Sequence, residues 1–150
     1  MKTAINIINT KKQTANFLIE NVTVSLDVYP RLHIDTFDLS LISGVLRHGS
    51  MGFSLKNFPI KIIVKKAKRD KIITKSNIDV GALDAKIDLN KLREYIRKDE
   101  FYEVEIENKN EVREHTGLGT STQILGGIYL CCAKLSGIDL NIQDLFKLGL

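Results

Sequence analysis

The spacing of apolar residues predicts a chain that alternates between strands and helices. Residues 22–26 and 31–37 alternate apolar with polar side chains, which is the period-two pattern of a half-buried strand. In the second segment the apolar positions that begin with Leu32 share one side, and the polar positions that begin with His33 share the other. We therefore expect the polar side chains to face away from the core or into a cleft. Further strands are predicted at residues 49–55, 60–64 and 101–106.

The longest apolar segment, residues 121–135, predicts a buried helix because it is apolar almost all round. Gly126 and Gly127 lie inside it, and each costs up to about 1 kcal/mol relative to alanine in a helix. Close packing against another element is the expected compensation. Gly137 is expected to end this helix, and residues 142–148 to begin another.

A shorter helix is predicted at residues 88–97, where apolar side chains recur at near-helical spacing and Asp88 is a plausible N-cap. Before it, a dense basic run extends from Lys61 to Lys71. We interpret this run as a solvated loop or strand end, since it has no aromatic stacking partners and matches no nucleic-acid-binding module. Residues 1–21 are either an N-terminal extension or an extra strand.

The stretch from Glu114 to Gln123, Glu-His-Thr-Gly-Leu-Gly-Thr-Ser-Thr-Gln, is the strongest indication of chemistry in the chain. Gly117 and Gly119 allow a tight turn and close approach of a ligand, and three consecutive hydroxyl residues follow. Thr120 or Ser121 can cap the predicted helix, whose free N–H groups and dipole attract anions. The stretch therefore predicts a phosphate cradle. A turn that only caps a helix is the alternative.

Two common phosphate-binding motifs are excluded. No Gly-Lys-Ser/Thr follows a four-residue spacer, so the stretch is not a Walker loop. Gly117 and Gly119 lack the third glycine of the dinucleotide fingerprint, and no βαβ unit with an acidic strand end follows.

Three segments resemble the GHMP kinase superfamily, which includes galactokinase, homoserine kinase, mevalonate kinase and phosphomevalonate kinase. The glycine-hydroxyl stretch is similar to its second motif, Pro-x3-Gly-Leu-Gly-Ser-Ser-Ala. The Thr122-Gln123 ending is closer to the archaeal β-ribofuranosylaminobenzene 5′-phosphate synthases of that superfamily. Residues 30–39 resemble the family's opening Pro-Ser-Arg-Leu-His-Phe-x-Leu-Ile-Asp-Leu, and residues 48–55 resemble its Gly-Gly-Ile-Gly-Leu-Ala-Leu.

The chain also departs from this pattern. Arg113 stands where the second motif has proline, and His48 replaces the first glycine of the Gly-Gly-Ile-Gly element. Ser121 occupies the position of the glycine that follows the hydroxyl in the synthases, as it does in the kinases.

The resemblance implies an α+β fold, a mixed sheet with helices packed on one face, of the ribosomal protein S5 domain 2-like type. The leading implied function is a synthase that joins phosphoribosyl pyrophosphate to a 4-aminobenzoate-type acid, releasing CO₂ and pyrophosphate on the path to methanopterin. The first alternative is an ATP-dependent small-molecule kinase. The second is a non-catalytic half-domain or truncated fragment. Both enzymes imply Mg²⁺, and the kinase also implies ATP.

Roles for individual residues follow from the resemblance together with side-chain chemistry. Asp38 and His33 are expected to be catalytic, although a strand-end carboxylate and a lone strand histidine are often structural. The phosphate-binding residues are expected to be Gly117, Leu118, Gly119, Thr120, Ser121, Thr122 and Gln123. The substrate-binding residues are expected to be Arg31, His48, Gly49, Ser50 and His115. The expected Mg²⁺ ligands are Thr120, Ser121 and Glu114.

Composition fits one cytoplasmic domain of 150 residues with a net charge of +4, which gives a mild preference for anionic ligands. The adjacent Cys131 and Cys132 suit neither a structural disulfide nor a zinc site, and we interpret them as reduced, buried thiols. No signal peptide or membrane-spanning run is evident. Residues 22–150 match only the N-terminal domain of the family. We therefore expect either a missing C-terminal half or association as a homo-oligomer, and no nucleic-acid or membrane partner.

Overall fold

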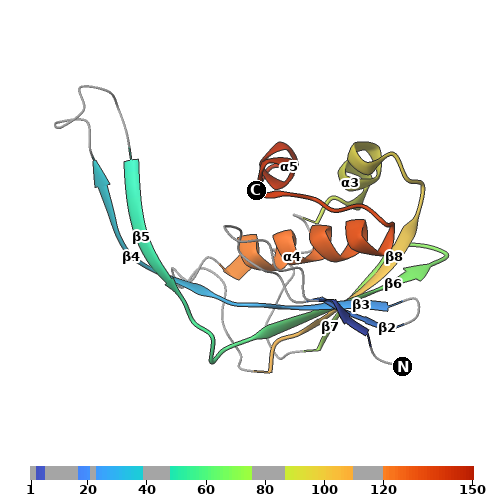
Figure 1. Ribbon diagram of the computed structural model, residues 1–150, viewed down its shortest axis with the longest axis horizontal. Coiled ribbons are helices and arrows are strands. Elements are labelled where there is room, and N and C mark those ends of the chain that lie inside the picture. The colour runs from blue at the N-terminus through green and yellow to red at the C-terminus, as the bar shows by residue number, and fades with distance from the viewer. Residues whose placement is uncertain (1–2, 6–16, 21–22, 39–47, 76–86, 110–119) are drawn as a thin grey trace.

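The computed structural model describes residues 3–5, 17–20, 23–38, 48–75, 87–109 and 120–150, and for residues 3–5, 17–20, 33–38 and 48–51 it describes the backbone alone. The largest element is a six-stranded sheet (Figure 1). In spatial order its strands are β1 (Thr3–Ile5), β2 (Phe17–Glu20), β3 (Thr23–Val28), β6 (Ile60–Ala67), β8 (Phe101–Glu107) and β7 (Lys71–Lys75). Neighbouring strands are antiparallel except β7 and β8, which are parallel, so the sheet is mixed as predicted.

Among the described elements, the sequence pattern did not predict strand β7. Its residues, Lys-Ile-Ile-Thr-Lys, begin at Lys71, the last residue of the basic run that we interpret as a loop or strand end. In the structure Lys61 and Lys65 belong to β6 and Lys71 begins β7, so most of the run is strand rather than loop. The β-branched Ile72, Ile73 and Thr74 carried the strand signal.

One face of the sheet forms the core. Along β3, β6 and β8 the alternate apolar side chains are buried, and register places these side chains opposite one another, as in Leu26↔Ile62 and Ile62↔Ile106. The other face carries charge. Glu103 and Glu107 of β8 lie between β6 and β7 lysines, and Glu103 pairs with Lys65 at 2.8 Å. The alternation therefore decides which face receives the helices.

In the described part of the chain, three helices lie on the apolar side of the sheet (Figure 1). They are α3 (Leu89–Ile96), α4 (Thr120–Leu135) and α5 (Ile142–Lys147). The predicted helices are confirmed, including the N-cap, since the Asp88 side chain accepts a hydrogen bond from Lys91 N. Helix α4 packs directly on β3 and β6. Gly137, with φ of 78°, follows its end as expected.

Polar side chains fasten the helices to the sheet. Arg93 of α3 pairs with Asp70 at 2.7 Å, and the second oxygen of Asp70 accepts the backbone N–H of Tyr102 at 3.0 Å. Just after the C-terminal end of α4, the Ser136 hydroxyl donates to Glu100 at 2.7 Å and lies 2.6 Å from the hydroxyl of buried Tyr102. These contacts fix α3 and the end of α4 against β8.

The strands β4 (Arg31–Asp38) and β5 (His48–Ser54) form a separate two-stranded sheet that projects from the body (Figure 1). The expectation that Leu32 faces the core is wrong. Its side chain is 42% exposed, because β4 leaves the main sheet and, of the described strands, pairs with β5 alone. None of the described helices combines the length and the apolar character needed to span a membrane.

Candidate functional site

The first turn of α4 forms one end of a pocket. Ser121 and Thr122 line it, and Leu125 and Tyr129 continue its floor along the same face of the helix. Residues four apart share a face, and each four-residue step advances about 6 Å along the axis. The floor from Ser121 to Tyr129 therefore runs about 12 Å.

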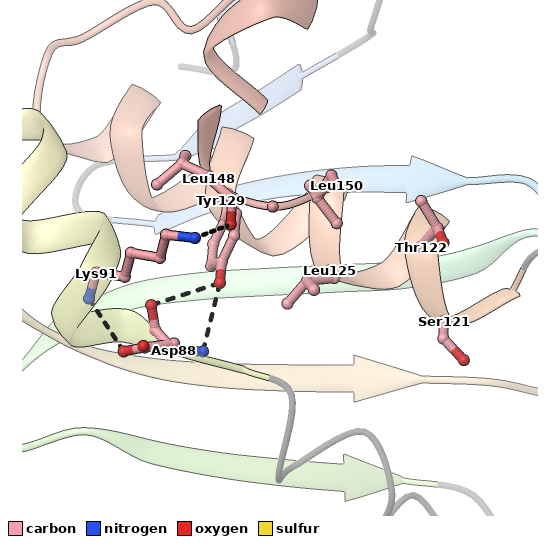
Figure 2. A pocket seen from close by; sticks show the side chains of 9 residues that line it. Asp88, Lys91, Ser121, Thr122, Leu125, Tyr129, Leu148 and Leu150 are labelled. Atoms are coloured by element: carbon pink, nitrogen blue, oxygen red, sulfur yellow. Dashed lines mark hydrogen bonds between the residues drawn. The ribbon is translucent and has the colours of Figure 1, made fainter. Parts of the chain in front are cut away.

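Two other elements complete this pocket, which we call the α4 pocket. Figure 2 shows the side chains that line it, and its volume is ≈ 410 Å³. The start of α3 supplies Asp88 and Lys91, and the segment after α5 supplies Leu148, Gly149 and Leu150. The pocket thus has hydroxyls and a helix N-terminus at one end, leucines along its length, and a carboxylate with an ammonium at the other end.

Hydrogen bonds order the far end of the α4 pocket. The Tyr129 hydroxyl lies 3.4 Å from both the backbone N and the backbone O of Asp88. Burial raises the pKa of Tyr129, so this hydroxyl stays protonated at neutral pH. Lys91 Nζ donates to the carbonyl oxygen of Leu148 at 3.0 Å (Figure 2). The one cation among the described lining residues therefore rests on a neutral acceptor.

The predicted phosphate-binding residues divide into three groups. Ser121 and Thr122 line the pocket. Thr120 is 3% exposed and Gln123 is half-buried, and neither is among the described lining residues. The remaining predicted residues of this loop lie outside the described residues: Glu114, His115, Gly117, Leu118 and Gly119.

The other predicted site residues lie on the hairpin of β4 and β5. Register places Asp38 opposite His48, and Gly49 and Ser50 follow opposite Phe37 and Thr36, so the two sequence motifs form one unit. The end where β4 finishes and β5 begins stands clear of the helices (Figure 1). The backbone therefore brings Asp38 and His48 together but does not bring them to the α4 pocket.

The base of the hairpin is closely packed. His33 is paired with Gly52, and a Cβ at Gly52 would lie 2.8 Å from the carbonyl oxygen of Leu32 and 3.2 Å from Cγ of Arg31. Only glycine accommodates this approach without a shift. The stem of the Arg31 side chain consequently lies across Gly52, where the hairpin leaves the main body.

Sequence reasoning missed most of the pocket lining. Asp88 was predicted only as a cap, and Lys91, Leu125 and Tyr129 had no predicted role. Leu125 and Tyr129 follow Ser121 at four-residue intervals, which is the signal that could have placed them on the Ser121 face. The contribution of the segment after α5 had no local signal, because it depends on how α5 folds back over α4.

The described residues contain no group of three or more His, Cys, Asp or Glu side chains that could hold a metal. Mg²⁺ does not require such a cage, since it is commonly held by one or two protein oxygens together with ligand phosphates and water. The hydroxyls of Ser121 and Thr122 in the pocket are compatible with that kind of site.

No known family model and no curated protein sequence matches this chain. Solved structures do match it. Phosphomevalonate kinase from Streptococcus pneumoniae superposes with a TM-score of 0.61 and 15% identity over 85% of this chain. Mevalonate kinase from Staphylococcus aureus gives 0.58 and 13% over 85%, and homoserine kinase from Cytophaga hutchinsonii gives 0.55 and 14% over 93%.

The match covers only part of each kinase chain. The chain spans 39% of the phosphomevalonate kinase, 43% of the mevalonate kinase and 42% of the homoserine kinase. All three are small-molecule kinases of the superfamily that the sequence motifs resemble. The predicted α+β fold is confirmed: this chain has the fold of the N-terminal domain of GHMP kinases.

Proposed function

We propose that this chain is the nucleotide-binding part of a small-molecule kinase of the GHMP type. The observation that carries the proposal is the position of Ser121 and Thr122. They belong to the glycine-hydroxyl stretch and line the α4 pocket at the first turn of a 16-residue buried helix. Such a turn offers hydroxyl and backbone donors together with the positive end of the helix dipole to a phosphate. The shared fold supports the same reading, because the similar structures are kinases.

Charge and shape agree with an elongated phosphorylated ligand. The hydroxyl end of the pocket suits phosphates, and the floor of Leu125 and the wall of Leu150 suit an apolar or aromatic body. A bound Mg²⁺ would neutralise charge that develops on the transferred phosphoryl group. Ser121, with the ligand phosphates, would hold it. Thr120 is buried and Glu114 lies outside the described residues, so their predicted metal roles stay predictions.

The acceptor side of the reaction is assigned only from sequence. Asp38 and His33 on β4 remain the predicted catalytic residues, and Arg31, His48, Gly49 and Ser50 the predicted substrate-binding residues. The chain spans about two fifths of the length of the similar kinases, so we also propose, rather than infer from them, that it takes part in a complete phosphoryl-transfer reaction.

A phosphoribosyl pyrophosphate-dependent synthase is the second candidate. Gln123 favours it, since it follows Thr122 as in the archaeal synthases and lies half-buried in the first turns of α4. The same cradle would bind the pyrophosphate group, which would leave with CO₂ as 4-aminobenzoate is joined to the ribose.

Two measurements test these functions. Calorimetric titration with MgATP and with phosphoribosyl pyrophosphate plus Mg²⁺ reports binding, and Gly119→Val should abolish it by filling the space that a ligand needs. Thr10→Ala, remote from the motif in sequence, serves as the control. Formation of ADP from ATP and an alcohol identifies the kinase, whereas release of labelled CO₂ from carboxyl-labelled 4-aminobenzoate identifies the synthase. No heat with either ligand from folded protein would refute both.

A further inference from the structure

The segment after α5 forms one wall of the α4 pocket. We call Leu148, Gly149 and Leu150 the strap. Their backbone N–H groups bond back to carbonyls of Asp144, Phe146 and Leu145, at 3.1, 3.0 and 3.2 Å. Leu150 lies over α4, with its Cδ1 3.6 Å from where a Cβ on Gly126 would be. The strap is therefore held by the end of a six-residue helix and by the Leu148 side chain, which is 4% exposed and belongs to the core, so Gly149 and Leu150 are the part that can move.

Lys91 ties this strap to α3. Its Nζ donates to the Leu148 carbonyl at 3.0 Å (Figure 2). A Cβ at Gly149 would lie 3.2 Å from the same nitrogen. Gly149 has φ of 96°, a left-handed conformation that disfavours any other residue. The close approach of the lysine and the bend of the strap thus both depend on this glycine.

The side chain of Tyr95 joins α3 to α5. The Tyr95 hydroxyl donates to Asp144 Oδ1 at 2.6 Å. Lys91 and Tyr95 are four residues apart, so they lie on one face of α3. If Lys91 releases the Leu148 carbonyl, α5 stays bonded to α3 through Tyr95, while the strap loses its hydrogen bond to α3 beside the pocket.

We propose that Lys91 is a latch with two partners: it holds the strap in the empty protein, and it transfers to the non-phosphate end of the bound ligand, so that occupancy of the α4 pocket releases the strap. The proposal rests on the proposed nucleotide-binding function and assigns a recognition residue and a coupled movement to the same pocket. Lys91 lies with Asp88 at the end of the pocket marked by Tyr129, which is about 12 Å along α4 from Ser121 (Figure 2). A ligand with phosphates at Ser121 consequently presents its other end to Lys91.

The chemistry favours such an exchange. The present partner of Lys91 is a single neutral carbonyl. A nucleoside base offers ring-nitrogen or carbonyl acceptors to Lys91, and its N–H groups can donate to the Asp88 carboxylate. Since the equilibrium between the two partners is reciprocal, anything that frees Lys91 beforehand must raise affinity for the ligand.

Calorimetry with MgATP and with magnesium tripolyphosphate tests the latch, because tripolyphosphate has no base to reach Lys91. Lys91→Met is expected to weaken MgATP binding by up to about tenfold, since the bond to the ligand is lost together with the weaker bond to Leu148, and to leave tripolyphosphate binding unchanged. Lys98→Met, an exposed lysine just beyond α3, is the matched control and is expected to bind both ligands as the wild type does.

Gly149→Ala distinguishes a coupled movement of the strap from a Lys91–ligand contact that leaves the strap in place. It strains the strap without removing Lys91, so MgATP affinity is expected to rise about threefold, and in the Lys91→Met background that gain should vanish. Tyr95→Phe loosens α5 by a different route and should also raise MgATP affinity. In wild-type protein, the Gly149 and Leu150 amides should exchange faster by NMR with MgATP bound, and not with tripolyphosphate.

The outcomes are distinct. Equal MgATP affinity in the wild type and in Lys91→Met, a gain from Gly149→Ala that persists without Lys91, or slower amide exchange on binding would each overturn the latch and leave the proposed function standing. Failure of the wild type to bind either ligand would overturn the proposed function, and the latch with it.

Discussion

Gly127 of α4 faces Ile62 of β6 with no room for a side-chain carbon between them. A Cβ at Gly127 would overlap Ile62 Cδ1 and lie 2.6 Å from Val28 Cγ1. At this point the helix backbone rests directly on the sheet. The pocket depends on this contact, because it sets the height of α4 above β3 and β6.

Neighbouring glycines in α4 are expected to respond to alanine in opposite ways. Gly127→Ala should lower the free energy of unfolding by about 1–2 kcal/mol, as an overpacking cost of about 1–3 kcal/mol outweighs a gain in helix propensity of up to about 1 kcal/mol. Gly126→Ala meets Leu150 Cδ1 at an ordinary 3.6 Å and should keep that gain. Urea unfolding of both variants checks this. Equal effects at the two positions would mean that α4 does not lie against the sheet as described.

Sequence alone predicted the main elements because local pattern determines them. The alternation in β3 and β8, the buried character of α4 and the Asp88 cap all appear in the structure. The glycine pair was expected to compensate for its low helix propensity by close packing, and Gly127 confirms this.

The errors arose where partners far apart in the chain decide the outcome. Leu32 carries the pattern of a core strand, yet it is exposed because β4 lies outside the main sheet and pairs with β5. Likewise, the pocket is built where Lys91 and Leu148, 57 residues apart, meet over α4. Motif spacing found Ser121 and Thr122 and had no means of finding these tertiary partners.

Glu100 predicts a specific acid sensitivity. Hydrogen bonds from Lys66 at 2.6 Å and from Ser136 at 2.7 Å lower the pKa of Glu100 below its usual 4.5. A carboxyl whose folded-state pKa is depressed stabilises the fold above its unfolded pKa, and this contribution is lost as pH falls through the folded pKa.

Glu100→Gln should therefore lower the melting temperature at pH 7, modestly because the pair is partly exposed, with a cost of up to about 1 kcal/mol. The difference from wild type should shrink below pH 4.5 and disappear in stronger acid. Glu94→Gln, an exposed acid on α3, is the control. A difference that stays constant from pH 7 to pH 2 would show that the Glu100 carboxylate is not the cause.

The thiols of α4 are expected to be inert in the folded protein. Cys131 and Cys132 are both fully buried, and burial raises the pKa of each thiol well above its usual value. The thiolate is the reactive form, so neither cysteine should react with a disulfide reagent at pH 8, whereas both should react in urea. Rapid native labelling of one thiol per chain would mean that α4 separates from the sheet.

Exposed apolar side chains predict self-association of the 150-residue chain. Leu32 and Phe53 are direct partners in the hairpin and are 42% and 57% exposed, and Ile142 and Phe146 on one face of α5 are 63% and 65% exposed. Exposed apolar area of this kind favours association in water. Multi-angle light scattering should show a mean mass that rises with concentration above the monomer's 16.9 kDa. Phe53→Lys should shift that mass toward the monomer, and Phe53→Leu, which keeps the apolar surface, should not. A monomer at every concentration, with ATP turnover, would show that these residues function without a second copy and that their exposure has no role in assembly.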